Sequence, residues 1–136
     1  MPNYWVLKTE PSTYSYDTLV KDGSTYWDGV KNPVALKHIR SVKKGDLALI
    51  YHTGKEKAAI GIARITSGPY PDPAQDDEKA AVFDLKAVKA LKRPVTLKEI
   101  KSDRTFENMA LVRQGRLSVV PATKKQWDRL LKLGGG

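Results

Sequence analysis

The sequence contains no cysteine, which excludes disulfide bridges, thiolate metal sites and thiol nucleophiles. Its two histidines, His38 and His52, lie far apart in the sequence and in no metal-ligand pattern. The glycine-rich phosphate loop, the dinucleotide-binding glycine pattern and the nucleophile elbow are also missing. We therefore expect a protein that is not an enzyme and has no catalytic residue, metal or cofactor.

Long apolar runs are also missing. No segment approaches the length that a membrane span requires. The first residues, 1–4, have no basic stretch followed by an apolar run, so they do not resemble a secretion signal. We expect a cytoplasmic protein with no membrane contact.

What the chain does have is positive charge. It carries 24 lysines and arginines against 15 acidic residues, which gives a net charge of +9 in 136 residues. Such a surplus attracts polyanions, so nucleic acid is favoured as a partner over a charge that serves only solubility. The hydrophobic share of 40% suits one folded domain over residues 1–136, with a core from about 3 to 132.

Strand and helix signals alternate along the chain. Apolar runs predict strands, and capping residues predict the starts of short helices. The expected strands are 4–9, 47–52, 59–65, 82–88 and 117–120. The expected helices follow Ser15, Asn32, Thr96 and Thr123, with one further turn or helix holding Phe106 and Met109. Segments 26–32 and 67–73 are expected to be loops. This order favours an α+β fold with a mixed, barrel-like sheet over a doubly wound one.

Three clusters occur together: 4–11 (YWVLKTEP), 27–32 (WDGVKN) and 113–121 (RQGRLSVVP). Between them lie Lys44-Gly45-Asp46, Tyr51-His52, Gly61-Ile62-Ala63 and Tyr70-Pro71-Asp72-Pro73. In this order and spacing the chain resembles the EVE domain, a member of the PUA-like superfamily that also contains the YTH and ASCH domains. The likeness runs from about Tyr4 to Leu131.

The resemblance implies a PUA-like fold, a mixed β-barrel with short helices around it. It also implies recognition of DNA or RNA that carries modified bases, with a flipped base taken into an aromatic pocket. In the family the pocket is lined by the segment after the first strand, the tryptophan loop and neighbouring strand ends. Carried onto this chain, these places are Lys8, Thr9, Glu10, Trp27, Asp28, Lys31, Asn32, Tyr51, His52, Arg116, Leu117 and Ser118.

The chain departs from the family pattern at several positions. Thr9 stands where serine is usual. Lys31 stands where arginine is usual, and this change keeps the positive charge but loses the planar guanidinium group that can donate two hydrogen bonds at once. The family often continues after Asn32 with Tyr-Gln-Ala-Arg-Asn, whereas residues 33–37 read PVALK. The segment between Pro73 and Val82 also looks shorter than in many relatives. The identity of the bound base is therefore left open.

The residue types suggest roles within such a pocket. Trp27 offers a plane for stacking, and its polar, turn-forming neighbours favour a pocket over a core position. Trp5 and Trp127 lie in apolar patterns and are expected in the core. Arg113 and Arg116, with Lys8 and Lys31, are expected to contact phosphates.

Two other functions stay open at this stage. One is an enzyme or small-ligand binder acting on a nucleotide or phosphorylated molecule, suggested by His52 beside Tyr51 and by Glu10. The other is a protein-interaction domain whose basic face meets an acidic partner. The sequence identifies no partner protein, and we expect a monomer.

Overall fold

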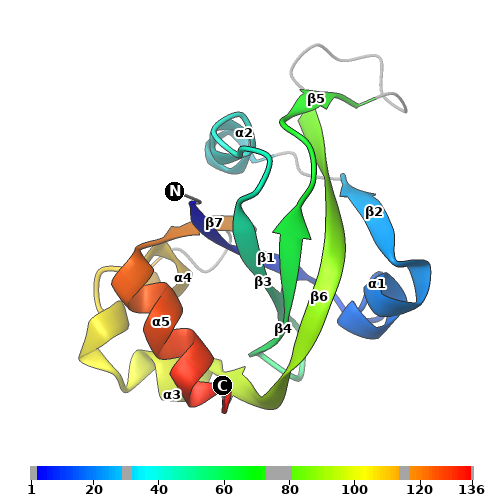
Figure 1. Cartoon of the computed structure of the whole chain (residues 1–136). Coiled ribbons are helices and arrows are strands. Elements are labelled where there is room, and N and C mark those ends of the chain that lie inside the picture. Colours follow the sequence, from blue (N-terminus) through cyan, green and yellow to red (C-terminus); the bar gives the residue numbers. More distant parts are fainter. Residues whose placement is uncertain (1–2, 29–31, 73–80, 114–116, 136) are drawn as a thin grey trace.

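The computed structural model describes residues 3–28, 32–72, 81–113 and 117–135. Within these ranges one mixed sheet organises the chain (Figure 1). Its strands are β1 (Tyr4–Thr9), β2 (Ser24–Trp27), β3 (Leu47–His52), β4 (Ala58–Ile65), β5 (Tyr70–Pro71), β6 (Ala81–Thr96) and β7 (Val119–Ala122). The order across the sheet is β2-β6-β4-β3-β1-β7, with β5 paired to β6.

The helices are short and lie around this sheet. They are α1 (Tyr16–Asp22), α2 (Pro33–Ile39), α3 (Leu97–Lys101), the 3₁₀ helix η1 (Arg104–Phe106), α4 (Ala110–Arg113) and α5 (Lys124–Leu133). In Figure 1, α3 and α5 lie at the lower left, and α1 lies at the right beside the edge strand β2. The expected α+β, barrel-like architecture with surrounding short helices is confirmed.

The predicted helix starts are confirmed by their caps. The side chains of Ser15 and Asn32 accept backbone N–H groups at the starts of α1 and α2. Thr96 and Thr123 form capping boxes with Glu99 and Gln126 at the starts of α3 and α5. Each of these side chains accepts a backbone N–H group that has no partner within the helix. Because the cap lies within a few residues of that group, the local sequence was sufficient to predict these helices.

Three strand predictions need correction. Residues 24–27 form β2, although Tyr26 and Trp27 were expected in a loop, because β2 pairs with the core strand β6. Tyr70–Pro71 forms the short strand β5 within the expected loop 67–73. β6 runs on to Thr96 rather than ending at residue 88, because β4 pairs along its length through register shifts.

β7 also differs from its expected range. It covers Val119–Ala122 and continues through Pro121, where the sequence predicted its end. Proline donates no ladder hydrogen bond, but β7 is an edge strand that pairs only with β1 among the described strands. The edge position therefore tolerates the proline.

The core confirms the expected positions of Trp5 and Trp127, which are 5% and 3% exposed. The indole N–H of Trp5 donates to the buried carboxylate of Asp46 at 2.9 Å. Asp46 also accepts the backbone N–H groups of Asn3 and Lys43, both at 2.9 Å. This carboxylate therefore fixes the start of β1 against the turn before β3.

α1 packs closely on β4 at Gly61. A methyl group at Gly61 would overlap the ring of Tyr16, whose hydroxyl donates to the carbonyl of Ile62 at 2.8 Å. The lack of a side chain at Gly61 thus leaves room for an aromatic ring against β4. This contact sets the position of α1, whose preceding turn borders the candidate site.

Candidate functional site

A cavity of about 420 Å³ opens between the end of β1, the turn after it and β2. Its volume lies within the range typical of small-ligand pockets. Polar and aromatic side chains line it together. They are Lys8, Thr9, Glu10, Thr13, Tyr14, Thr25, Tyr26, Trp27, Asp28 and Ser118.

Backbone hydrogen bonds bring two distant segments together at this cavity and shape the turn after β1. The N–H of Lys8 donates to the carbonyl of Ser118 at 2.8 Å, which joins the end of β1 to the segment before β7. Behind Glu10 the chain turns, since the N–H groups of Thr13 and Tyr14 both donate to the Glu10 carbonyl at 2.9 Å. Pro11 favours this turn because it ends the strand ladder.

Side chains reinforce the turn. The Thr9 hydroxyl donates to the carbonyl of Tyr14 at 2.8 Å, and the Tyr14 hydroxyl donates to Asp22 on α1 at 3.0 Å. Burial, followed by the hydrogen bond to Asp22, raises the pKa of Tyr14. Tyr14 therefore stays a neutral donor near pH 7, and the wall that it forms is tied to α1.

The two carboxylates at the cavity differ in their partners. Glu10 accepts hydrogen bonds from the Ser12 and Thr53 hydroxyls at 3.2 and 3.3 Å, so it ties the turn to the loop after β3. Asp28 is exposed and forms no hydrogen bond or ion pair with any described residue. Of the two, Asp28 is thus the carboxylate available to accept from a ligand.

Trp27 combines a core position with a cavity position. It is 7% exposed and belongs to the hydrophobic core, yet it lines the cavity. Its indole N–H has no hydrogen-bond acceptor among the described residues. Among these residues, every side-chain polar atom that is fully buried does have a hydrogen-bond partner. The N–H is therefore not fully buried. The sequence favoured a pocket over a core position for Trp27; the structure gives it both, because β2 pairs with the core strand β6.

Among the described residues that line the cavity, Lys8 is the one that carries a positive charge. Its side chain is half-buried, and burial lowers its pKa from the ordinary value of 10.5. The ammonium nitrogen lies 5.9 Å from the centre of the Tyr51 ring, within the range of a cation–π contact. The aromatic face helps to hold this charge at the cavity rim.

Tyr51 and His52, both predicted for the pocket, do not line this cavity. Tyr51 is buried at 3% exposure and borders a neighbouring hollow instead. His52 is buried as well, and its Nε2 accepts the backbone N–H of Tyr16 at 2.9 Å. Its Nδ1 lies 3.2 Å from Glu56 Oε2. Both ring nitrogens of His52 thus contact other groups of the protein rather than a ligand site.

Three further predicted residues lie elsewhere. The Asn32 side chain caps α2 by accepting from the N–H groups of Val34 and Ala35. Arg113 donates to the carbonyl of Glu107 at 2.8 Å, and Leu117 is a core residue at 3% exposure. Lys31 and Arg116 lie outside the described residues. The cavity therefore gathers Lys8, Thr9, Glu10, Trp27, Asp28 and Ser118 from the predicted set.

Four lining residues were missed: Thr13, Tyr14, Thr25 and Tyr26. A signal for two of them was present, since residues 24–27 read STYW, a β-branched and aromatic run typical of a strand. In a strand, residues two apart share a face, so Thr25 accompanies Trp27. Thr13 and Tyr14 depend on the turn after Glu10, which the sequence marks only through Pro11.

The described residues contain no group of three or more potential metal ligands. Nor does any helix in these ranges have the length and apolar character needed to cross a membrane. The cavity offers an indole N–H, hydroxyls, a carboxylate and an ammonium group around an aromatic wall. Such a set suits a planar, polar ligand held by hydrogen bonds and ring contacts.

Comparisons with known proteins agree on one family. The EVE domain family model matches residues 3–133. Chicken thymocyte nuclear protein 1 is 30% identical, and the match covers 96% of this chain and 68% of that protein.

Several solved structures resemble the chain over almost its whole length. Rpa0253 from Rhodopseudomonas palustris is 41% identical with a TM-score of 0.92, covering 98% of this chain and 93% of that one. Human THYN1, solved in complex with 5-methylcytosine-containing DNA, is 28% identical with a TM-score of 0.90, covering 98% of both chains. An ASCH protein from Zymomonas mobilis, 17% identical with a TM-score of 0.64, covers 96% of this chain and 94% of that one and shares the fold.

Proposed function

Since this chain belongs to the EVE domain family, we propose that it binds nucleic acid carrying a modified base, and that the base is flipped into the cavity beside Trp27. DNA is the first partner to test, because the similar human protein was solved with DNA containing 5-methylcytosine. RNA is the second, because an unpaired base in either polymer presents the same ring and edge to the cavity.

The observation that carries this proposal is the mixture of groups in one cavity of suitable size. A flipped base needs an apolar wall for its ring and hydrogen bonds for its edge. Trp27 and Tyr26 provide aromatic surface, and the Trp27 N–H and Asp28 provide an available donor and acceptor. The net charge of +9 attracts the phosphates that accompany the base.

The enzyme hypothesis loses its main support in this geometry. It depended on His52 as an acid or base, but both nitrogens of His52 already contact Tyr16 and Glu56. Glu10, the other residue invoked, is bound to Ser12 and Thr53. We keep the expectation of a binding protein without catalytic residues as part of the proposal.

The test measures the affinity of short oligonucleotides that are identical except for one modified cytosine or adenine. We expect tighter binding of at least one modified form. Asp28→Asn is expected to weaken binding of the preferred modified oligonucleotide about fivefold, because a carboxylate that accepts from an exocyclic amino group contributes about 1 kcal/mol or more. Fluorescence anisotropy at fixed salt measures both quantities.

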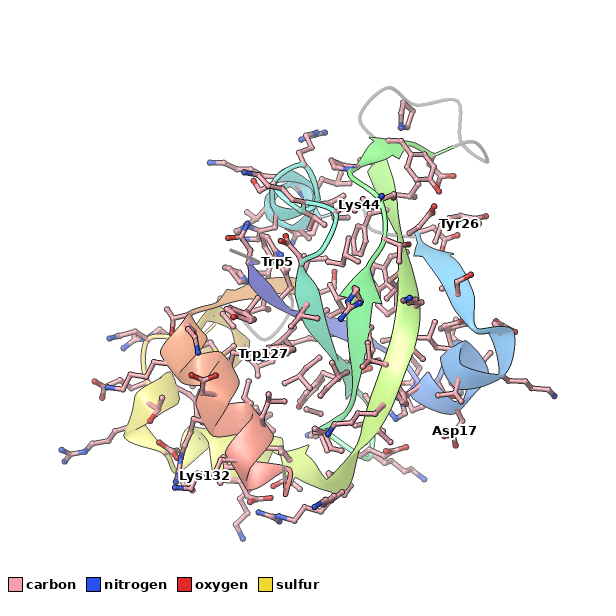
Figure 2. All side chains as sticks on the ribbon, viewed as in Figure 1. Trp5, Asp17, Tyr26, Lys44, Trp127 and Lys132 are labelled. Carbon is pink, nitrogen blue, oxygen red and sulfur yellow. The ribbon has the colours of Figure 1, made fainter. Side chains whose placement is uncertain are left out.

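Asp17→Asn is the matched control. Asp17 is an exposed residue of α1 that does not line the cavity, and its replacement removes the same charge (Figure 2). It is expected to leave this affinity nearly unchanged. Equal affinity for all oligonucleotides, or equal effects of the two substitutions, would contradict the proposal. Trp27→Ala is unsuitable, because the loss of core packing costs about 3–5 kcal/mol.

A further inference from the structure

A basic groove continues from the cavity across the surface. Lys8 borders both the cavity and a neighbouring hollow of about 170 Å³. This hollow shares Lys57 and Lys101 with a third, open depression of about 510 Å³, which Lys55 and Lys98 also line. The shared residues show that the three hollows adjoin, and we call the second and third together the lysine groove.

The lysine groove differs from the cavity in charge. Its residues Lys55, Lys57, Lys98 and Lys101 are exposed, and none of these lysines forms an ion pair with a described residue. Among its described lining residues Glu56 is the sole carboxylate, and it lies 3.2 Å from the His52 ring. The cavity, by contrast, has Glu10 and Asp28 in its wall.

The fold fixes the two segments that supply these lysines. Lys55 and Lys57 come from the loop between β3 and β4, and Lys98 and Lys101 lie three residues apart on α3 and so share a helix face. The carbonyl of Lys57 accepts the N–H of Leu97 at 2.7 Å, which joins the loop to the start of α3. The lysines are therefore held on one continuous surface.

Lys57 also has an unusual backbone. Its φ of 44° is the sole positive value at a non-glycine position within the described ranges. A left-handed conformation costs an ordinary residue about 1 kcal/mol or more, and such strain is concentrated where a ligand is held. At this position a lysine that lines the groove stands where a glycine would adopt the conformation without cost.

We propose that the lysine groove binds the sugar–phosphate backbone of the strand whose base enters the cavity. This inference rests on the proposed function and adds the path that the bound strand follows across the surface. The backbone leaves the cavity past Lys8, continues to Lys57 and Lys101 and ends near Lys55 and Lys98. Exposed ammonium groups suit phosphates as point charges, whereas the cavity's own carboxylates would repel them.

The test compares two triple variants that lose the same charge. One is Lys57→Gln with Lys98→Gln and Lys101→Gln; the control is Lys37→Gln with Lys43→Gln and Lys44→Gln. Lys44 precedes β3 and Lys57 follows it, so the six-residue strand separates the two sets by about 17 Å. Figure 2 shows Lys44 at the end of the sheet near α2, away from α3. Melting curves establish that both variants are folded.

The readout is the salt dependence of binding to a single-stranded oligonucleotide. Each phosphate contact on a single strand contributes about −0.7 to the slope of log K against log salt, so losing three contacts should reduce the slope by about 2. We expect this change, and at least tenfold weaker binding, in the groove variant alone. The ratio of affinities for modified and unmodified strands should stay the same.

Two results would overturn the inference. Equal loss in both variants would mean that only net charge matters. An unchanged slope in the groove variant would mean that this face serves solubility or an acidic protein instead. A wild-type protein with no preference for modified bases would refute the proposed function alone, because the slope comparison does not depend on that preference.

Discussion

His52 illustrates how a polar side chain can serve the backbone rather than a ligand. Its Nε2 satisfies the Tyr16 N–H at the start of α1, and its Nδ1 faces Glu56 in the loop after β3. The first N–H of a helix has no partner within the helix, so a buried start needs one from outside. Sequence alone placed His52 at a strand end but could not supply this partner, which lies 36 residues away.

Replacing His52 with alanine should therefore destabilise the fold. The Tyr16 N–H would be buried without an acceptor, which costs about 1–3 kcal/mol in the free energy of unfolding. Urea denaturation measures this loss. His38→Ala is the control, because His38 is only partly buried and contacts the Trp5 ring at 6.1 Å between centroids. Equal stability losses in the two variants would contradict the role given to His52.

Trp27 shows the limit of prediction at the same scale. The polar neighbours of this residue favoured a pocket over a core position, but pairing with Phe83 also brings the ring into the core. The sequence found the residue and its place beside Asp28. It could not find that the same ring also packs in the core, because that packing depends on pairing with β6.

At the scale of elements, a charged pair joins η1 to α5. Arg129 Nε donates to Asp103 Oδ2 at 2.7 Å, and the other carboxylate oxygen accepts the Thr105 N–H at 3.0 Å. The hydrogen bond from Arg129, followed by those from Thr105, lowers the pKa of Asp103 from 3.8 to about 2. The carboxylate thus caps η1 and fixes α5 at the same time.

This pair should give the stability a measurable acid dependence. A carboxyl group whose pKa is lower in the folded state stabilises the fold above its unfolded pKa and loses that effect as the pH falls through its folded pKa. The stability advantage of wild type over Asp103→Asn should be full above about pH 4 and should shrink as the pH falls towards about 2. Thermal melts across this range measure it, and parallel curves would refute the role of the charge.

Local signals predicted the elements unevenly. Capping residues predicted the helix starts because a cap satisfies its own backbone within three residues. The strands β2, β5 and the second half of β6 were missed or shortened because their stability comes from pairing across the sheet. Element prediction succeeded where the stabilising partner was near in sequence.

At the scale of the whole molecule, the site is a product of topology. β1 lies between β3 and β7, so Ser118 reaches the end of β1 although more than a hundred residues separate them in sequence. The family resemblance supplied this juxtaposition in outline, and six of its predicted residues line the cavity. It could not supply the lysine groove, which depends on contact between the β3–β4 loop and α3.

The central claim is that a planar base enters the cavity beside Trp27, and the indole N–H signals in a ¹H–¹⁵N spectrum test it most directly. Trp5 and Trp127 serve as internal references, since the first donates to Asp46 and the second is buried on α5. On titration with a 5-methylcytosine oligonucleotide, the Trp27 signal, assigned by its loss in Trp27→Phe, should shift while the other two stay nearly unchanged. Saturated binding with an unmoved Trp27 signal would contradict the account.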